Sequence, residues 1–268
     1  MLRWPASRRP ILAAALTWLT AVLVACSASS PGASTPGSPH PSAPAHSSPD
    51  PPAPSGLTFT VAGTNPVLPN GSQDTHAQTP DTSCDHATLA SDHTLGLKIA
   101  RGFALAGFTA SADLLQHFLA GSGTGVSYPA GSRISQLALA SAAFQAVNSE
   151  VQDAIARQLK AGQTHVRLSA AQLPTVAFES TSSDLYWGFR GTQGLAVTGR
   201  GQRGNGRYTG TLSYVIQDSY GFPAGDTLGG FGAPMRYLQT ACGAPQQAGG
   251  ARWFPDAITV TVPFSQPA

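Results

Sequence analysis

Asp218 and Tyr220 are the residues whose types and position best suit catalysis, because they follow the strongest predicted strand of the chain. Carboxylates at the ends of strands that become buried are often catalytic, since burial perturbs their pKa. A purely structural alternative is a turn. In that case Asp218 caps local backbone N–H groups, while Tyr220 and Phe222 pack into the core.

The string Asp218-Ser219-Tyr220 resembles the Asp-x-Tyr motif of colicin M-type toxins, which cleave a lipid-linked precursor of the cell wall. The resemblance implies a hydrolase that acts on envelope material, with Arg236 as the supporting basic group. The chain departs from the family pattern after the tyrosine, because Gly221 stands where an acid is expected and no histidine follows.

Other catalytic patterns find little support. The chain has no Gly-x-Ser-x-Gly, and every histidine precedes the predicted sheet, so a triad would have to run His, Asp, Ser. His117 or His165 with Asp218 is conceivable for such a triad, but no pattern supports it. Glu150 and Glu179 are the only glutamates, so a glycosidase pair would need an aspartate that no pattern selects.

Metal binding is weakly supported by a local cluster. The cluster consists of Asp81, Cys84, Asp85, His86, Asp92 and His93. On a helix, the seven-residue spacing of its two histidines separates them by roughly 10 Å along the axis, too far to hold one ion together. We therefore predict no metal and no cofactor, and interpret the cluster as a helix start with surface histidines.

A glycine-rich string, Gly199-x-Gly201-x-x-Gly204, matches the dinucleotide-binding pattern in sequence but not in its predicted structural context. That motif needs a helix after the glycines, whereas a strand is predicted here. The same stretch contains Arg200, Arg203 and Arg207, and Asn205-Gly206 suits a type I′ turn. We predict an exposed basic hairpin end, which is either simply solvated or contacts an anionic wall polymer or lipid headgroup.

The first 26 residues resemble the signal peptide of bacterial lipoproteins. Arg3, Arg8 and Arg9 precede the apolar run 11–25, which at about 1.5 Å per residue is short for a membrane span. The tetrapeptide Leu23–Cys26 matches the lipobox, which implies cleavage before Cys26 and a lipid on its thiol. An ordinary signal peptide is the alternative. Residues 7–12 also resemble a twin-arginine export signal, so the export route stays open.

Residues 27–56 are rich in proline and serine and poor in large apolar side chains, a composition that predicts a disordered tether. We expect three regions: a signal peptide (1–25), a lipid-anchored tether (26–56) and one folded domain (57–268). Because the export signal predicts an oxidising compartment, the two other cysteines, Cys84 and Cys242, are expected to form a disulfide rather than remain free buried thiols.

The folded domain is predicted to be α+β, with an N-terminal helical part packed on a C-terminal antiparallel sheet. Helices are expected after Cys84 (a short one), from Ser111 to Gly121, and from Ser141 to Ala161, where apolar residues recur every three or four positions. A run at the start of the domain, 57–61, suits an edge strand. Later strands are expected at 166–168, 175–178, 185–189, 195–197, 208–216 and 258–264.

The net charge of +2, with charged residues at only 10% of the chain, gives no electrostatic case for nucleic acid. We expect an exported, membrane-anchored lipoprotein on the extracytoplasmic face, whose domain binds an envelope polymer or a protein partner without catalysis. The alternative is an envelope-acting hydrolase with its site near Asp218 and Tyr220.

Overall fold

The computed structural model describes residues 57–65, 84–190, 194–222, 230–241 and 251–268. By contacts, residues Gly56–Ala268 form a compact unit separate from Met1–Ser55. None of the helices in the described ranges is long and apolar enough to cross a membrane.

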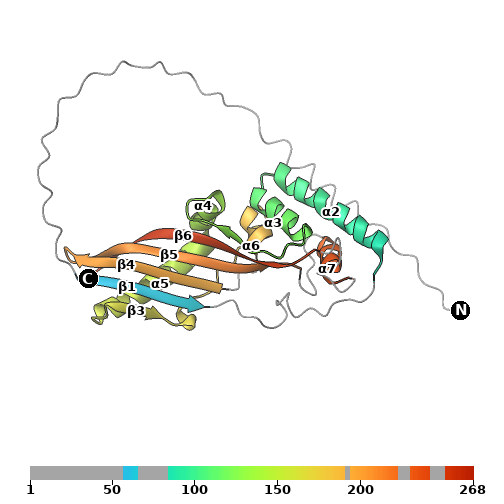
Figure 1. Cartoon of the computed structure of the whole chain (residues 1–268). Helices are drawn as coiled ribbons and strands as arrows, with labels where there is room; N and C mark the ends of the chain where they lie inside the picture. Colours follow the sequence, from blue (N-terminus) through green and yellow to red (C-terminus); the bar gives the residue numbers. More distant parts are fainter. Residues whose placement is uncertain (1–56, 66–83, 191–193, 223–229, 242–250) are drawn as a thin grey trace, which may run out of the picture. The chain divides into compact units, whose positions relative to one another are not determined.

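A six-stranded mixed sheet forms the centre of the domain, in the order β2-β6-β5-β4-β1-β3 (Figure 1). Its strands are β1 (Thr58–Asn65), β2 (Val126–Tyr128), β3 (His165–Leu168), β4 (Gly194–Gly204), β5 (Arg207–Tyr220) and β6 (Phe254–Pro267). The four central strands pair antiparallel, while the short edge strands β2 and β3 pair parallel to β6 and β1. The fold is therefore α+β as predicted, but its sheet is mixed rather than purely antiparallel.

The helices come mainly from the first half of the domain. They are α2 (His86–Leu105), α3 (Thr109–Leu119), α4 (Arg133–Ala140), α5 (Ala142–Lys160), α6 (Asp184–Phe189) and α7 (Gly232–Thr240), with a short 3-10 helix η3 at Ala170–Gln172. Helix α2 packs on α3 and α7, whereas α4, α5 and α6 pack on the sheet.

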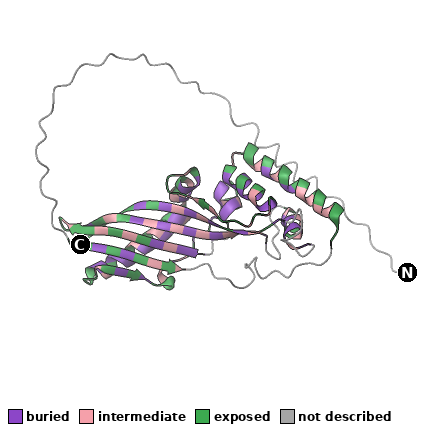
Figure 2. Cartoon of the chain, in the orientation of Figure 1, coloured by how far each residue is buried: buried purple, intermediate pink, exposed green. Residues whose placement is uncertain are grey.

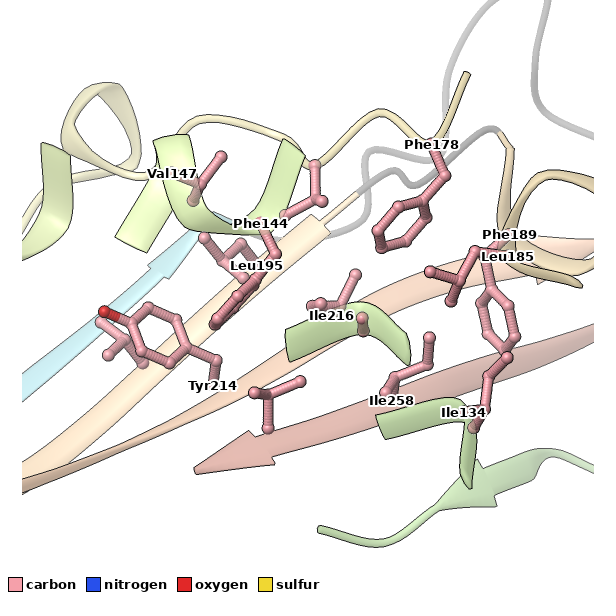
Figure 3. Packing of buried hydrophobic residues seen from close by; sticks show 14 of the residues in the cluster. Ile134, Phe144, Val147, Phe178, Leu185, Phe189, Leu195, Tyr214, Ile216 and Ile258 are labelled. Carbon is pink, nitrogen blue, oxygen red and sulfur yellow. The ribbon is translucent and has the colours of Figure 1, made fainter. Parts of the chain in front are cut away.

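In the described part of the chain, helices pack on one face of the sheet. Side chains along β5 and β6 alternate between buried and more exposed, as the banding of the strands in Figure 2 shows. The covered face packs against α5, where the rings of Phe144 and Tyr214 meet edge to face with centroids 5.2 Å apart (Figure 3). The other, open face carries mainly threonine, serine and other small or polar side chains, which are exposed or half-buried in the described strands.

Helix α5 forms where its apolar spacing predicted it. The hydroxyl of Ser141 accepts a hydrogen bond from the backbone N–H of Phe144, which caps the first turn. After the helix, Gly162 adopts φ 86°, a left-handed conformation that favours glycine, and ends it. Gly121 does the same after α3, with φ 68°.

The turn between β4 and β5 is also confirmed. Asn205 and Gly206 have φ values of 50° and 69°, as a type I′ turn requires. The glycines before it serve close packing: a Cβ on Gly201 would lie 2.2 Å from the carbonyl oxygen of Thr209 and 2.5 Å from the ring of Phe59. Gly201 thus makes room for an aromatic ring over the strand, and no helix follows the glycine string.

Several predicted elements are wrong. Residues 185–189, expected as a strand, lie in helix α6, which starts at Asp184 with Ser183 as its N-cap. Residues 175–178, also expected as a strand, have no regular secondary structure. The helix after Cys84 is long rather than short, with 20 residues. Strand β1 is internal, not an edge, because the short strand β3 pairs with its outer side.

Helix α3 begins earlier than its predicted start at Ser111. The helix starts at Thr109, which places Ser111 inside its first turn and fully buried. The capping acceptor comes from Asp184, a residue far away in sequence. Sequence spacing shows only local caps, so this one was missed.

Candidate functional site

Asp218 and Asp256 form a buried carboxyl pair on the covered face of the sheet. They lie directly opposite each other on the antiparallel strands β5 and β6. Their exposed fractions are only 6% and 3%. Opposite residues of an antiparallel pair have Cβ atoms about 4.5–5.5 Å apart, so the two carboxyl groups are neighbours.

The pair has few hydrogen-bond partners. One oxygen of Asp218, Oδ1, accepts a hydrogen bond of 2.8 Å from the backbone N–H of Ser219. Both carboxyl oxygens of Asp256 are buried without a hydrogen-bond partner in the described part of the chain. A buried ionised carboxylate in this setting is strongly disfavoured, so protonation is the favourable response.

The electrostatics of the pair follow from this burial. Burial raises the pKa of Asp218 to about 7, while the Ser219 N–H acts in the opposite direction. Burial, and then the charge of Asp218, raise the pKa of Asp256 well above its ordinary value. Two like charges this close cannot both ionise easily, so the pair holds at least one proton at neutral pH.

Tyr128 on β2 belongs to the same environment. It is half-buried, and its ring contacts Phe189 edge to face with centroids 5.7 Å apart. Burial first, and then the charges of Asp256, Asp113 and Asp184, raise its pKa, so its phenol stays protonated. The neighbourhood thus keeps the Tyr128 phenol and at least one of the two aspartates in their neutral forms.

The predicted partners of Asp218 are placed differently from what the colicin M-type resemblance implies. The ring of Tyr220 is 7% exposed and stacks on Phe254 with centroids 5.4 Å apart. Arg236 is exposed on α7, and no basic group contributes to the pKa of Asp218. The predicted packing of Tyr220 and Phe222 is confirmed, since both rings are buried.

The local cluster after Cys84 does not gather around a common point. Asp85 is the N-cap of α2, where its carboxylate accepts hydrogen bonds from the Ala87 N–H (3.0 Å) and the Thr88 hydroxyl (2.6 Å). The Thr88 hydroxyl, followed by nearby backbone N–H groups, lowers the pKa of Asp85. His86 and His93 follow on the helix, and the described residues contain no group of three potential metal ligands. Asp81 lies outside the described residues.

The two histidines considered for a triad form hydrogen bonds with residues other than Asp218. His117 Nε2 lies 2.8 Å from the Thr124 carbonyl oxygen, within a local turn. His165 sits on the open face of β3, where its Nδ1 lies 3.0 Å from the hydroxyl of Thr60. The ring of His117 also packs edge to face on Phe254, with centroids 4.5 Å apart, and no hydrogen bond joins either histidine to Asp218 in the described part of the chain.

The three arginines of the predicted basic hairpin lie where expected, at one end of the sheet, and all three are exposed. The guanidinium of Arg203 lies over the ring of Tyr208, 5.6 Å from its centroid. Arg207 donates from Nη2 to the Ser265 hydroxyl at 2.9 Å. Two other predicted site residues, Cys26 and Cys242, lie outside the described residues.

Sequence inspection missed Asp256 and Asp184. Asp256 lies two residues before Ile258 and so shares its inward face, a signal that would have required extending the predicted strand backwards. Asp184 was hidden because residues 185–189 were assigned to a strand. Comparisons with known proteins add no relatives: no family model, no curated protein and no solved structure matches the chain.

Proposed function

We propose that the chain is an exported lipoprotein, anchored through Cys26 at the extracytoplasmic face of the membrane, whose domain binds an envelope component without catalysis. The observation that carries the proposal is the position at which the fold begins. Strand β1, the first element of the described fold, starts at Thr58, directly after the Pro/Ser-rich stretch. This start supports the predicted order of signal peptide, tether and folded domain.

Binding is favoured over catalysis by the environment of the acidic groups. Asp218 and Asp256 are buried in the core, where the pair holds at least one proton at neutral pH, and the carboxylate of Asp184 accepts from three hydrogen-bond donors. The accessible polar surface is instead the open face of the sheet. A broad, rigid, solvated face of this kind suits recognition of a large partner.

The anchor is tested by metabolic labelling with palmitate in a bacterial host. We expect the full chain to incorporate label and fractionate with membranes, and Cys26→Ala to lose the label entirely. Cys84→Ala serves as the matched control and should keep it. Equal labelling of the full chain and Cys26→Ala would refute the anchor at this residue.

The alternative function, an envelope-acting hydrolase, is favoured by one observation: carboxyl pairs with a raised pKa are typical of acid catalysts. It predicts that the purified domain cleaves a lipid-linked wall precursor and that Asp218→Asn abolishes the cleavage. The non-catalytic proposal predicts no cleavage by either protein. Thin-layer chromatography of the radiolabelled precursor separates the two outcomes.

The Cys84–Cys242 disulfide is also part of the proposal. The backbone N–H of Asp85 donates to the hydroxyl of Tyr237 at 3.1 Å, so the start of α2 lies beside α7. Asp85 follows Cys84 directly, and Tyr237 precedes Cys242 by five residues. We expect a disulfide-linked peptide pair in non-reduced digests analysed by mass spectrometry, and its loss in Cys84→Ser. Recovery of both cysteines as alkylated thiols, without prior reduction, would contradict it.

A further inference from the structure

We propose that the end of the sheet around the β4–β5 turn is a docking surface for an anionic phospholipid membrane. The proposal depends on how charge is distributed between the two ends of the domain. The proposal rests on the proposed lipid anchor only for the orientation of the domain toward the membrane. Its test uses protein that lacks the lipid anchor.

Basic residues are concentrated at this end. The chain has 15 Lys and Arg against 13 Asp and Glu, and three of the arginines lie in the signal region with no acid. The remaining chain is therefore slightly acidic, with twelve basic residues against thirteen acidic ones. Half of these twelve lie on four elements that meet at one end of the sheet: Arg157 and Lys160 on α5, Arg167 on β3, Arg200 and Arg203 on β4, and Arg207 on β5.

Contacts between these elements establish that they meet. The hydroxyl of Tyr208 donates to the carbonyl of Leu159, which joins the last turn of α5 to β5 beside the turn. The amide of Gln158 binds the backbone of Arg167 on β3, with distances of 3.0 and 3.3 Å. In the sheet, Thr60 of β1 lies between His165 of β3 and Arg200 of β4.

Acidic residues are scarce at this end. Strands β1, β3 and β4 contain no acidic residue. Asp218 and Asp256 lie together at the end of β5 and β6 that is far from the β4–β5 turn. Helix α5 carries Glu150 and Asp153 in its earlier turns, and the carboxylate of Ala268 follows β6. The six basic residues therefore outnumber the neighbouring carboxylates and create a positive field at the tip.

The basic side chains surround the tip rather than line a groove. Arg200 and Arg207 belong to the open face, whereas Arg203 alternates to the covered side and the α5 residues lie on the helix layer. From Arg200 to the turn the strand runs about 13 Å, so all of the strand arginines can approach one plane. A flat anionic surface fits this arrangement better than a single polymer chain, which would need a cleft.

An exposed leucine favours a lipid surface over a wall polymer. Leu57 is 62% exposed at the same tip, and its carbonyl accepts a hydrogen bond of 2.8 Å from the backbone N–H of Arg203. An apolar side chain among arginines is the combination that binds membrane interfaces. Leu57 also directly follows the predicted tether in the sequence, so the described domain begins at the end that carries the charge.

The test is sedimentation of the chain from residue 26 onward, with Cys26→Ser, against vesicles of phosphatidylcholine with 30% phosphatidylglycerol or of phosphatidylcholine alone. We expect binding to the anionic vesicles only, weakened by added salt. Arg200→Ser with Arg203→Ser and Arg207→Ser should weaken the partition constant by roughly 100-fold, since each basic residue at an anionic surface is worth about fivefold.

The matched control removes the same charge elsewhere, by Lys98→Ser, Arg101→Ser and Arg236→Ser, and should bind anionic vesicles like the parent. If the tip variant does not fold, Lys160→Glu with Arg200→Glu, which changes two exposed side chains, replaces it. Equal weakening by tip and control variants, equal binding to both vesicles, or binding only to a purified anionic wall polymer would overturn the proposal. Palmitate labelling tests the anchor independently of vesicle binding. Failure of the docking surface is therefore distinguishable from failure of the anchor.

Discussion

The folded domain is expected to lose stability as the pH rises from about 4 to 7, because of the pair Asp218 and Asp256. In the unfolded chain both carboxyl groups ionise near their ordinary pKa of 3.8. In the folded domain burial raises the pKa of Asp218 to about 7, and that of Asp256 is raised as well. Between these values the folded state holds protons that the unfolded state has released, so stability decreases with increasing pH.

The magnitude follows from linkage. One extra proton in the folded state lowers the free energy of unfolding by about 1.4 kcal/mol per pH unit, or about 4 kcal/mol over three units. Asp85, whose pKa is lowered, acts in the opposite direction but only below its ordinary pKa of 3.8, outside this window. Urea denaturation followed by circular dichroism at pH 4, 5, 6 and 7 measures the slope.

Substitution of both acids distinguishes the contribution of this pair to the pH dependence of stability from that of the other titratable groups. Asp218→Asn with Asp256→Asn removes the titration and should flatten the pH dependence, whereas Asp153→Asn on the exposed face of α5 should leave it intact. Stability that rises or stays constant from pH 4 to 7 in the parent chain would contradict the buried neutral pair. Hydrogen exchange at residues 218–222 should become faster as the pair ionises, once corrected for the intrinsic pH dependence of exchange.

Local patterns in the sequence predicted much of this fold. The apolar stripe that places α5 between Ser141 and Ala161 and the Asn205-Gly206 turn both depend on neighbours within a few residues, and both were confirmed. Residues 185–189 were missed because Leu185, Trp187 and Phe189 alternate like a strand, yet the Ser183 cap and packing against α3 make them a helix.

The carboxyl pair required information that the sequence does not display. Asp218 was identified from its position after a strand, but its partner Asp256 lies 38 residues later and meets it only through the register of β5 and β6. The grouping of basic residues at one end of the sheet also depends on tertiary contacts that the sequence does not display. The arginines of the hairpin were visible as a local group, whereas those of α5 and β3 join them only because the last turn of α5 packs beside β5.

Replacement of Asp184 by alanine is expected to destabilise the domain by about 3 kcal/mol, because three buried donors lose their acceptor. Its carboxylate accepts from the Ala110 N–H (3.0 Å), the Ser111 N–H (2.8 Å) and the Ser111 hydroxyl (2.6 Å). The two N–H groups belong to the first turn of α3, where the helix has no internal acceptors for them. Asp184 is 3% exposed, so water has little access to replace it.

Two comparisons identify the cause of this loss. Asp184→Asn keeps one acceptor oxygen and should lose less stability than Asp184→Ala, while Ser141→Ala, which removes the local cap of α5, should lose about 1 kcal/mol. Because Asp184 also starts α6, its loss uncouples α3 from α6, and proteolysis should become faster in both helices together. Equal stability of Asp184→Ala and the parent chain in urea denaturation would show that α3 does not depend on this cap.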